Sequence, residues 1–259
     1  MKKIVFLMMI LAVLATGCSQ KKKSKSLNYN DSDPISMVLR GNHKINVSSD
    51  YDISYRILNN DSTKTVLEIN SNGVLYGKNV GEDQVFISNG YESKTIDVKV
   101  DLFTEPTFEF GCGPNRIKSF YGNPYYSGFS GENLVYIYTS DNGYSYACGE
   151  MDFLFKNNSY FQSILYIRKG LDGILDNYLD DNFVIFDTVQ DTVTATWPTT
   201  HDTIITRHLY KNKLDESIIC GKQPALNQWE ETVLFYIRVD ENSRDNSLKM
   251  RPLSSKFLY

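Results

Sequence analysis

Histidine and tryptophan are scarce in this chain, which has three histidines and two tryptophans among its 259 residues. The histidines show no H-x-H or HExxH spacing, and no Cys-x-x-Cys pair is present, so the sequence predicts no zinc site. No Walker loop, dinucleotide fingerprint or G-x-S-x-G elbow occurs either. We therefore expect no metal, no cofactor and no catalytic residues, and hence not an enzyme. A hydrolase with paired carboxylates stays open, because such pairs are recognised only in three dimensions.

Clustered positive charge is missing from most of the chain. The 31 acidic and 27 basic residues give a formal net charge of −4, which argues against a nucleic-acid partner. Six of the lysines precede Ser26, so residues 26–259 alone carry a charge of −10. Hydrophobic residues make up 41% and charged residues 22%, a globular composition that excludes a disordered or collagen-like chain.

The longest hydrophobic run, Ile4–Leu14, has eleven residues. It is too short for a transmembrane helix, which needs about 20 residues, but it follows two lysines and fits the apolar region of a secretory signal peptide. The next residues, Leu14-Ala15-Thr16-Gly17-Cys18, resemble the lipobox of bacterial lipoproteins, with the leucine one place further upstream than usual. The resemblance implies a signal peptide over residues 1–17 and a lipid anchor, palmitate included, on Cys18. The alternative is an ordinary secretory signal with a chance cysteine.

Residues 18–34 contain almost no apolar side chain, and we expect a flexible basic tether there. Its four lysines are either attracted to anionic lipid head groups or simply solvated. No acidic run follows Cys18, although surface lipoproteins of some Gram-negative bacteria resemble one another in such a run. We therefore expect an anchor in the outer membrane, with the periplasmic face favoured over the cell surface.

Residues 35–101 consist of short alternating runs separated by turn residues. The turn at Asn72-Gly73 lies between two apolar runs and predicts a hairpin, and residues 95–100 alternate strictly. No helical period is present, so we expect an all-β sandwich.

The same region resembles the bacterial Ig-like group 2 family. The similarity lies in residues 69–77, in Val80-Gly81-Glu82 and in the closing strand 96–100. A tryptophan common in that family is absent, and we expect Tyr55 to take its place. The resemblance implies either a spacer or an adhesive module, and we favour the spacer.

Residues 103–259 hold most of the aromatic residues and are predicted to form an α+β domain of antiparallel strands with two short helices. One helix begins at Pro114 and ends at Gly122, and the second covers Leu171–Leu179. The predicted strands are Pro106–Phe110, Leu134–Tyr138, Met151–Phe155, Phe161–Ile167, Phe183–Phe186, Thr192–Trp197, Thr203–Tyr210 and Thr232–Val239. A helix followed by a meander thus occurs twice, which suggests a duplicated unit. The fold class is therefore mainly β, an Ig-like sandwich followed by this domain.

The first half of this domain, residues 108–168, resembles the small outer-membrane lipoproteins of the SmpA/OmlA type. The similarity lies in Phe110-Gly111-Cys112-Gly113, in the Gly122-Asn123-Pro124 turn and in the strands that follow. It implies a protein-interaction module.

Three cysteines remain once Cys18 is set aside, an odd number for an oxidising compartment. Cys112–Cys148 is the disulfide that we would test first, because both residues belong to one predicted unit. Three unpaired thiols, including Cys220, are the alternative. Cys112 also precedes a helix N-terminus, which could lower its pKa.

Tyr125, Tyr126 and Phe129 are the best candidates for a ligand-binding surface, since they lie on a predicted glycine-rich loop. Exposed aromatic residues stack on sugars or anchor protein partners. Alternatively, the loop folds over the edge of the sheet. The resulting expectation is a non-enzymatic lipoprotein of the cell envelope, anchored in the lipid bilayer through Cys18, whose Ig-like spacer presents a C-terminal domain to an envelope protein. A glycan-binding surface lipoprotein is the alternative, ahead of a hydrolase.

Overall fold

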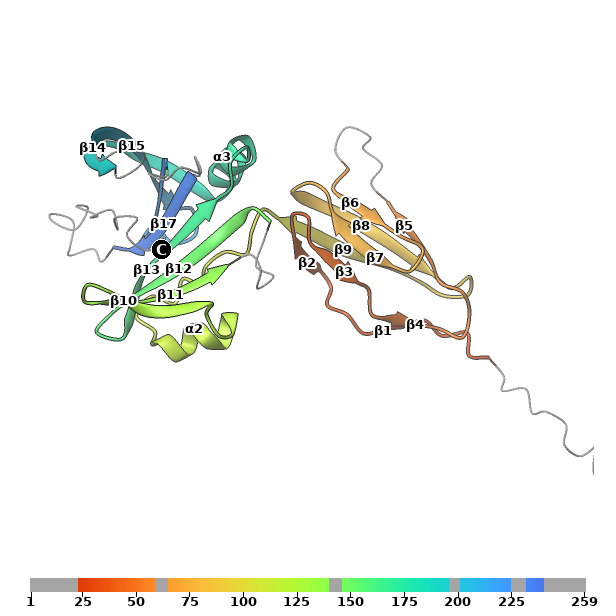
Figure 1. Ribbon diagram of the computed structural model, residues 1–259. Helices are drawn as coiled ribbons and strands as arrows, with labels where there is room; N and C mark the ends of the chain where they lie inside the picture. Colours follow the sequence, from red (N-terminus) through yellow and green to blue (C-terminus); the bar gives the residue numbers. More distant parts are fainter. Residues whose placement is uncertain (1–22, 59–64, 140–145, 196–200, 225–231, 240–259) are drawn as a thin grey trace, which may run out of the picture.

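The computed structural model describes residues 23–58, 65–139, 146–195, 201–224 and 232–239, which form two bodies joined by a short link (Figure 1). The predicted fold class is confirmed: the protein is mainly β, with an Ig-like sandwich followed by an α+β domain. The strands of the first body are β1 (Asn28–Tyr29), β2 (Ile35–Val38), β3 (Asn42–Lys44), β4 (Val47–Ser48), β5 (Ser54–Ile57), β6 (Leu67–Ile69), β7 (Val74–Gly77), β8 (Gly81–Ser88) and β9 (Ser93–Asp101).

The first body is a sandwich of a four-stranded sheet, β2-β9-β8-β5, and a three-stranded sheet, β3-β7-β6. Strand β2 runs parallel to β9, and the other pairs in these two sheets are antiparallel. Alternate residues of each strand point inward, so that Val85 and Ile96 from one sheet meet Leu67 and Leu75 from the other in a single apolar core.

The predicted hairpin at Asn72-Gly73 joins β6 to β7. The side-chain oxygen of Asn70 accepts hydrogen bonds from the backbone N–H groups of Asn72 and Val74, each at 3.0 Å. Gly73 has φ +73°, and the ring of Tyr55 lies so close that a Cβ on Gly73 would be 2.5 Å from it. Tyr55 therefore packs directly beneath this turn.

The prediction of a flexible tether over residues 18–34 is wrong for its described part. Residues 23–34 lie along the sandwich, where Asp50 accepts a hydrogen bond from the backbone of Ser24 at 2.6 Å and Glu92 accepts one from Leu27 at 2.8 Å. Tyr29 is half-buried against the core, and β1 pairs with β4. The prediction rested on the lack of apolar side chains in this segment. It did not include the carboxylates, distant in the sequence, that accept hydrogen bonds from its backbone.

The second body contains two helices within its described residues. Its elements are α2 (Pro114–Tyr121), β10 (Tyr126–Ser130), β11 (Asn133–Thr139), β12 (Cys148–Lys156), β13 (Ser159–Ile167), α3 (Asp172–Asn182), β14 (Phe183–Ala195), β15 (His201–Asn212), β16 (Ile218–Pro224) and β17 (Thr232–Arg238). Each helix is followed by four antiparallel strands. The two sets form one eight-stranded sheet in the order β10-β11-β12-β13-β17-β16-β15-β14, joined where β13 pairs with β17.

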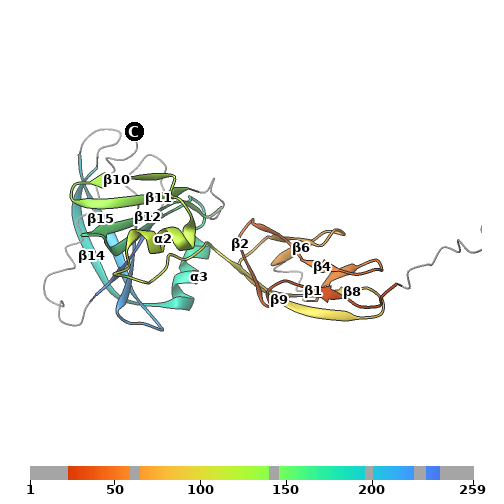
Figure 2. The ribbon, with the colours of Figure 1, turned by 90° about the horizontal axis from the view of Figure 1, so that it is seen from below.

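Both helices lie on one side of this sheet (Figure 2). Helix α2 begins with Pro114 at its first position and ends at Gly122, as predicted, and buries Ile117 and Tyr121. Helix α3 buries Leu175 and Leu179 on the same apolar core. Tyrosine and phenylalanine rings from the sheet fill the space below, which explains the aromatic content of this domain.

Pro106–Phe110 was expected as a short strand, but these residues belong to no strand. Three further predictions about the strands need correction. Phe183–Phe186 and Thr192–Trp197 were expected as separate strands, but β14 is continuous from Phe183 to Ala195, with a bulge between Ile185 and Asp187 (Trp197 lies outside the described residues). Strand β16 was not predicted, because Gly221 and the polar residues after it interrupt the apolar pattern. The third correction concerns β10 and is given with the site below.

The two bodies share part of one apolar core. Leu39, in the turn between β2 and β3, is 4% exposed and belongs to the core cluster of the second body. Leu102 and Phe103, which directly follow β9, lie in the same cluster. The link is therefore a packed joint.

Candidate functional site

The predicted aromatic residues lie at one edge of the eight-stranded sheet. Tyr126 and Phe129 belong to β10, so the prediction of a glycine-rich loop is wrong for these residues. Strand β10 pairs with β11 from Tyr126 opposite Ile137 to Phe129 opposite Leu134. Among the described strands it has no neighbour on its other side, so one row of its backbone N–H and C=O groups is unpaired within the sheet.

The three aromatic side chains do not share one face. Phe129 lies beside Leu134, which packs on the helix-covered core, whereas Tyr126 lies beside Ile137, which packs on the opposite face. Tyr125 directly precedes β10, which begins at Tyr126. The Tyr126 ring lies along the strand over Gly128, where a Cβ would approach its hydroxyl to 2.1 Å.

Exposure is high at the outer positions of this edge. Tyr125 is 74% exposed, Phe129 is 69% exposed and Tyr126 is 43% exposed. We call these three residues together with the unpaired side of β10 the aromatic edge. Large apolar side chains exposed along an unpaired strand are a feature that soluble proteins usually avoid unless a partner covers them.

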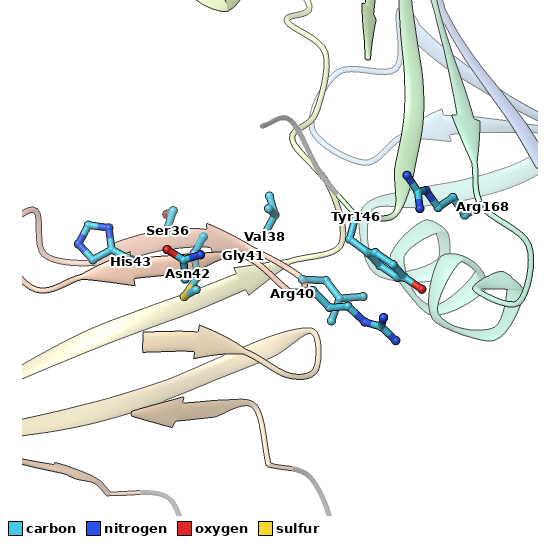
Figure 3. A pocket seen from close by; sticks show the side chains of 10 residues that line it. Ser36, Val38, Arg40, Gly41, Asn42, His43, Tyr146 and Arg168 are labelled. Atoms are coloured by element: carbon cyan, nitrogen blue, oxygen red, sulfur yellow. The ribbon is translucent and has the colours of Figure 1, made fainter. Parts of the chain in front are cut away.

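A second candidate site, which the sequence did not indicate, lies at the joint between the two bodies. It is a groove of about 620 Å³ lined by residues 36–43 of the first body together with Tyr146 and Arg168 of the second (Figure 3). The Arg40 guanidinium lies 3.9 Å from the centre of the Tyr146 ring, and that of Arg168 lies 5.3 Å from it. Among the described residues that line it there is no aspartate or glutamate. We call this feature the joint groove.

Arg40 lies in an unusual backbone conformation with φ +60°. Its turn is fixed by hydrogen bonds from the backbone N–H of Arg40 to Gly77 and of Gly41 to Val38, both at 2.8 Å. Non-glycine residues with positive φ are uncommon and persist where the surroundings fix them. Only one feature of the sequence indicated this turn, an arginine directly before a glycine.

The opposite end of the joint groove contains His43. Its Nε2 atom lies 2.7 Å from Oδ2 of Asp31, which also accepts a hydrogen bond from the backbone N–H of Asn46 at 2.9 Å. Burial alone would raise the pKa of Asp31, but the bonds from His43 and Asn46 outweigh it and lower the pKa below its ordinary value. The Asp31 carboxylate is therefore already satisfied by its own neighbours.

The predicted Cys112–Cys148 disulfide is not present, because Cys112, Cys148 and Cys220 are all free. The carbonyl of Cys112 accepts a hydrogen bond from Tyr160 at the start of β13, whereas Cys148 pairs with Ile167 at its end. Seven residues of strand separate those two points by about 23 Å, and a disulfide requires Cα atoms within about 7 Å.

The suggestion that Cys112 has a lowered pKa is also wrong. Burial, together with the nearby charge of Glu109, raises the pKa of its thiol. Cys112 lies one residue before the N-cap of the helix. Burial therefore raises the pKa of its thiol by more than the helix N-terminus lowers it. The structure thus favours three protonated thiols.

A pair of carboxyl groups lies on β12, where Glu150 and Asp152 project to the same face. Asp152 is buried, and burial together with the charge of Glu150 raises its pKa well above the ordinary value. Within the part of the chain that the structure describes, its Oδ1 atom has no hydrogen-bond partner. Neither residue lines the joint groove, so the groove offers no support for a hydrolase with these two carboxyl groups.

The predicted lipidation residue, Cys18, lies outside the described residues. Within the described residues no helix is long and apolar enough to cross a membrane. No group of three or more histidine, cysteine, aspartate or glutamate side chains in this part of the chain is arranged to hold a metal ion.

Comparison with known proteins adds no further constraint on function. No protein-family model matches the chain, and no curated protein matches it. The resemblances to bacterial lipoproteins, to the Ig-like group 2 family and to SmpA/OmlA modules therefore stay predictions. The functional argument rests on the aromatic edge.

Proposed function

We propose that the protein is a non-enzymatic lipoprotein of the cell envelope, anchored through Cys18, whose second body binds an envelope protein through the aromatic edge. The lipobox-like sequence before Cys18 supports the anchor. The sandwich, which lies between the anchor and the second body in the chain, serves as the spacer. The outer membrane, with the chain facing the periplasm, is the proposed location.

The observation that carries this proposal is the unpaired strand β10 with its exposed aromatic residues. An extended segment of a partner that adds to such an edge gains main-chain hydrogen bonds, and side-chain pockets beside the edge give specificity. Phe129 lies on one face of the strand and Tyr126 on the other, and the exposed Tyr125 directly precedes the strand. A partner strand would therefore meet aromatic side chains above and below its own backbone.

A glycan ligand is the second candidate, and the exposure of Tyr125 and Phe129 is the observation in its favour. Sugar rings stack on a flat aromatic surface, but Tyr126 and Phe129 lie on opposite faces of the sheet. Tyr125 and Phe129 are four residues apart in the chain, and of the two only Phe129 belongs to β10. This spacing suits two separate contacts better than one stacked ring, so the protein partner is preferred.

Site-specific photocrosslinking in intact cells tests the proposal. A photoreactive phenylalanine analogue would replace Phe129 in one variant, and Tyr76, 40% exposed on the sandwich, in a matched control. We expect a discrete crosslinked protein from position 129 that position 76 does not give, and its loss when Tyr125→Ser is added. Equal products from both positions, or none from position 129, would overturn the protein-binding proposal. Binding to a glycan array that is lost in Tyr125→Ser would favour the glycan.

The anchor is tested separately with Cys18→Ser. The unaltered protein should sediment with membranes and partition into detergent, and the variant should be found in the soluble envelope fraction. If Cys18→Ser stayed membrane-bound to the same extent, the lipid anchor would be wrong, whatever the outcome of the crosslinking.

A further inference from the structure

We propose that the end of the sandwich nearest to Cys18 is a membrane-contacting surface, with the rings of Tyr51 and Tyr91 in the head-group region of the bilayer. We call Tyr51 and Tyr91, together with Lys23 and Lys25, the tyrosine tip. The contact rests on the lipid anchor proposed above, and it involves a different surface from the aromatic edge. It would orient the sandwich so that the second body lies at the end away from the bilayer.

The first support is the position of the tyrosine tip in the molecule. It lies where the chain enters the sandwich, at the end away from the second body (Figure 1). Tyr91 is in the turn between β8 and β9, and β9 then runs to Asp101 at the joint. Lys23 follows Cys18 by five residues, and five residues reach at most about 18 Å even when fully extended. A lipid on Cys18 would therefore keep the tip close to the bilayer surface.

The second support is that the incoming chain is fixed to the tip by Asn89, which is 5% exposed. The side-chain nitrogen of Asn89 donates hydrogen bonds to the backbone carbonyls of Lys25, at 3.0 Å, and of Ser26, at 3.2 Å. Its side-chain oxygen accepts a hydrogen bond from the backbone N–H of Tyr91 at 3.0 Å. One buried side chain thus joins the chain that comes from the anchor to the turn that carries Tyr91. Such preorganisation lowers the entropy that the tip must lose on binding.

The third support is the chemistry of the exposed rings. The ring centroids of Tyr51 and Tyr91 lie 4.6 Å apart, and Tyr91 is 54% exposed. The Lys23 ammonium lies 5.3 Å from the centre of the Tyr51 ring, and that of Lys25 lies 4.7 Å from the centre of the Tyr91 ring. Tyrosine is enriched at membrane interfaces because its ring is apolar and its hydroxyl is polar. Two adjacent rings therefore suit the head-group region of a bilayer.

The rings, and not net charge, carry this contact. The carboxylates of Asp50 and Glu92 directly adjoin the two tyrosines in the chain, and they accept hydrogen bonds from the backbone of Ser24 and Leu27. These acidic groups offset the two lysines, so the tip is not strongly cationic. We therefore expect the contact to form on zwitterionic lipid, without anionic head groups.

The test is tryptophan fluorescence of the lipidated protein in phosphatidylcholine vesicles, with and without bromine on the acyl chains. Tyr91→Trp places a reporter at the tip. Tyr76→Trp is the matched control, because Tyr76 is 40% exposed and pairs with Asn42 near the joint. The signal of the unaltered protein, from Trp197 and Trp229, is subtracted. We expect brominated lipid to lower the emission from position 91 by about twofold or more and to leave position 76 unchanged.

Sedimentation of the same vesicles separates the contact from the anchor. Protein that stays in solution would overturn both the anchor and the contact. Protein that sediments without quenching at position 91, or with equal quenching at position 76, would overturn the contact alone.

A longer tether separates binding by the rings from proximity to the anchor. An insertion of about twelve glycine and serine residues after Gln20 removes the closeness that a short chain imposes. Quenching at position 91 should persist in this variant, because the rings themselves bind lipid. Complete loss of quenching would mean that the tether alone holds the tip near the bilayer, and it would overturn the proposal.

Discussion

The position of Gly73 requires both a positive φ and the absence of a side chain. Gly73→Ala would place a methyl group 2.5 Å from the Tyr55 ring in addition to the backbone strain. We expect the free energy of unfolding of the sandwich to fall by about 2–4 kcal/mol, measured by chemical denaturation.

Gly90 provides the matched control for this prediction. It has φ +82°, but no atom lies within 4 Å of the position where its Cβ would be. Gly90→Ala therefore isolates the backbone cost, about 1 kcal/mol. If both variants lost the same stability, close packing of Tyr55 under Gly73 would be refuted.

The second prediction concerns the reactivity of the cysteine thiols. Burial raises the pKa of Cys148 to about 12 and raises that of Cys220 as well. Both thiols therefore stay protonated at pH 8, and both are inaccessible. Cys112 is only half-buried, although its pKa is also raised. In the native protein iodoacetamide should modify Cys112 first and leave Cys148 and Cys220 intact, as mass spectrometry would show.

Denatured protein supplies the control, since all three thiols should then react at similar rates. Rapid labelling of Cys148 in the native state would contradict its buried position. Any Cys112–Cys148 disulfide found in peptides from the native protein would contradict the separation of these residues along β13.

At the scale of single residues, the sequence predicted local structure well where a residue type strongly favours one backbone conformation. Asn72-Gly73 predicted its hairpin, and Pro114 and Gly122 predicted both ends of α2. The same sequence could not place Tyr126 and Phe129, because Gly128 and two serines in β10 look like loop residues. Nor could it reveal the joint groove, whose arginines lie 128 positions apart in the chain.

Among the secondary-structure elements, helix α3 has an unfavourable sequence at its C-terminus. Its last residues include Asp180 and Asp181, whose negative charges oppose the helix dipole, and the last turn has no basic residue. The Lys213 ammonium compensates by donating hydrogen bonds to the backbone carbonyls of Asp180, at 2.5 Å, and of Asp181, at 2.9 Å. A cap for α3 thus comes from the loop after β15.

This cap predicts that Lys213→Met lowers the free energy of unfolding of the second body by about 1 kcal/mol. Part of the effect is electrostatic, so the difference from the unaltered protein should shrink in high salt. Lys156→Met is the control, because Lys156 is an exposed lysine at the end of β12. Urea denaturation at two salt concentrations measures both variants, and equal effects would argue against the cap.

Strands with a regular pattern of apolar residues could be predicted from the sequence. Strands that form only because neighbouring strands pair with them could not. Strands such as β11 to β13 alternate or are wholly apolar, and they were found near their true positions. Strand β16 contains Gly221 and Lys222, and it is a strand only because β15 and β17 pair with it on both sides. Likewise β14 continues through its polar middle because β15 pairs with it almost throughout. Tertiary pairing overrides local propensity in these cases.

At the scale of the whole molecule, the sequence suggested three separate pieces: a tether, a spacer and a binding domain. The described part of the tether instead lies on the sandwich, and there Lys23 and Lys25 stack on Tyr51 and Tyr91. Those two lysines therefore have partners in the protein and do not depend on lipid head groups. The sandwich in turn contributes Leu39 to the core of the second body.

The last prediction tests that shared core. Leu39→Ala should leave a cavity at the joint and lower the stability of the second body by about 2–4 kcal/mol, although residue 39 belongs to the first. Hydrogen exchange measures each body separately. We expect faster exchange of the amides of β12 and β13, with those of β8 and β9 little changed, because β8 and β9 enclose a different core.

Leu214→Ala is the matched control for this experiment, since Leu214 is 98% exposed and its loss should change neither body. A Leu39→Ala effect confined to β8 and β9 would mean that Leu39 serves only its own sandwich and that the bodies are joined by a simple linker. A packed joint and a simple linker give the sandwich different roles. With a packed joint, the sandwich sets the direction in which the aromatic edge faces, and a partner would meet β10 in a fixed orientation to the sandwich.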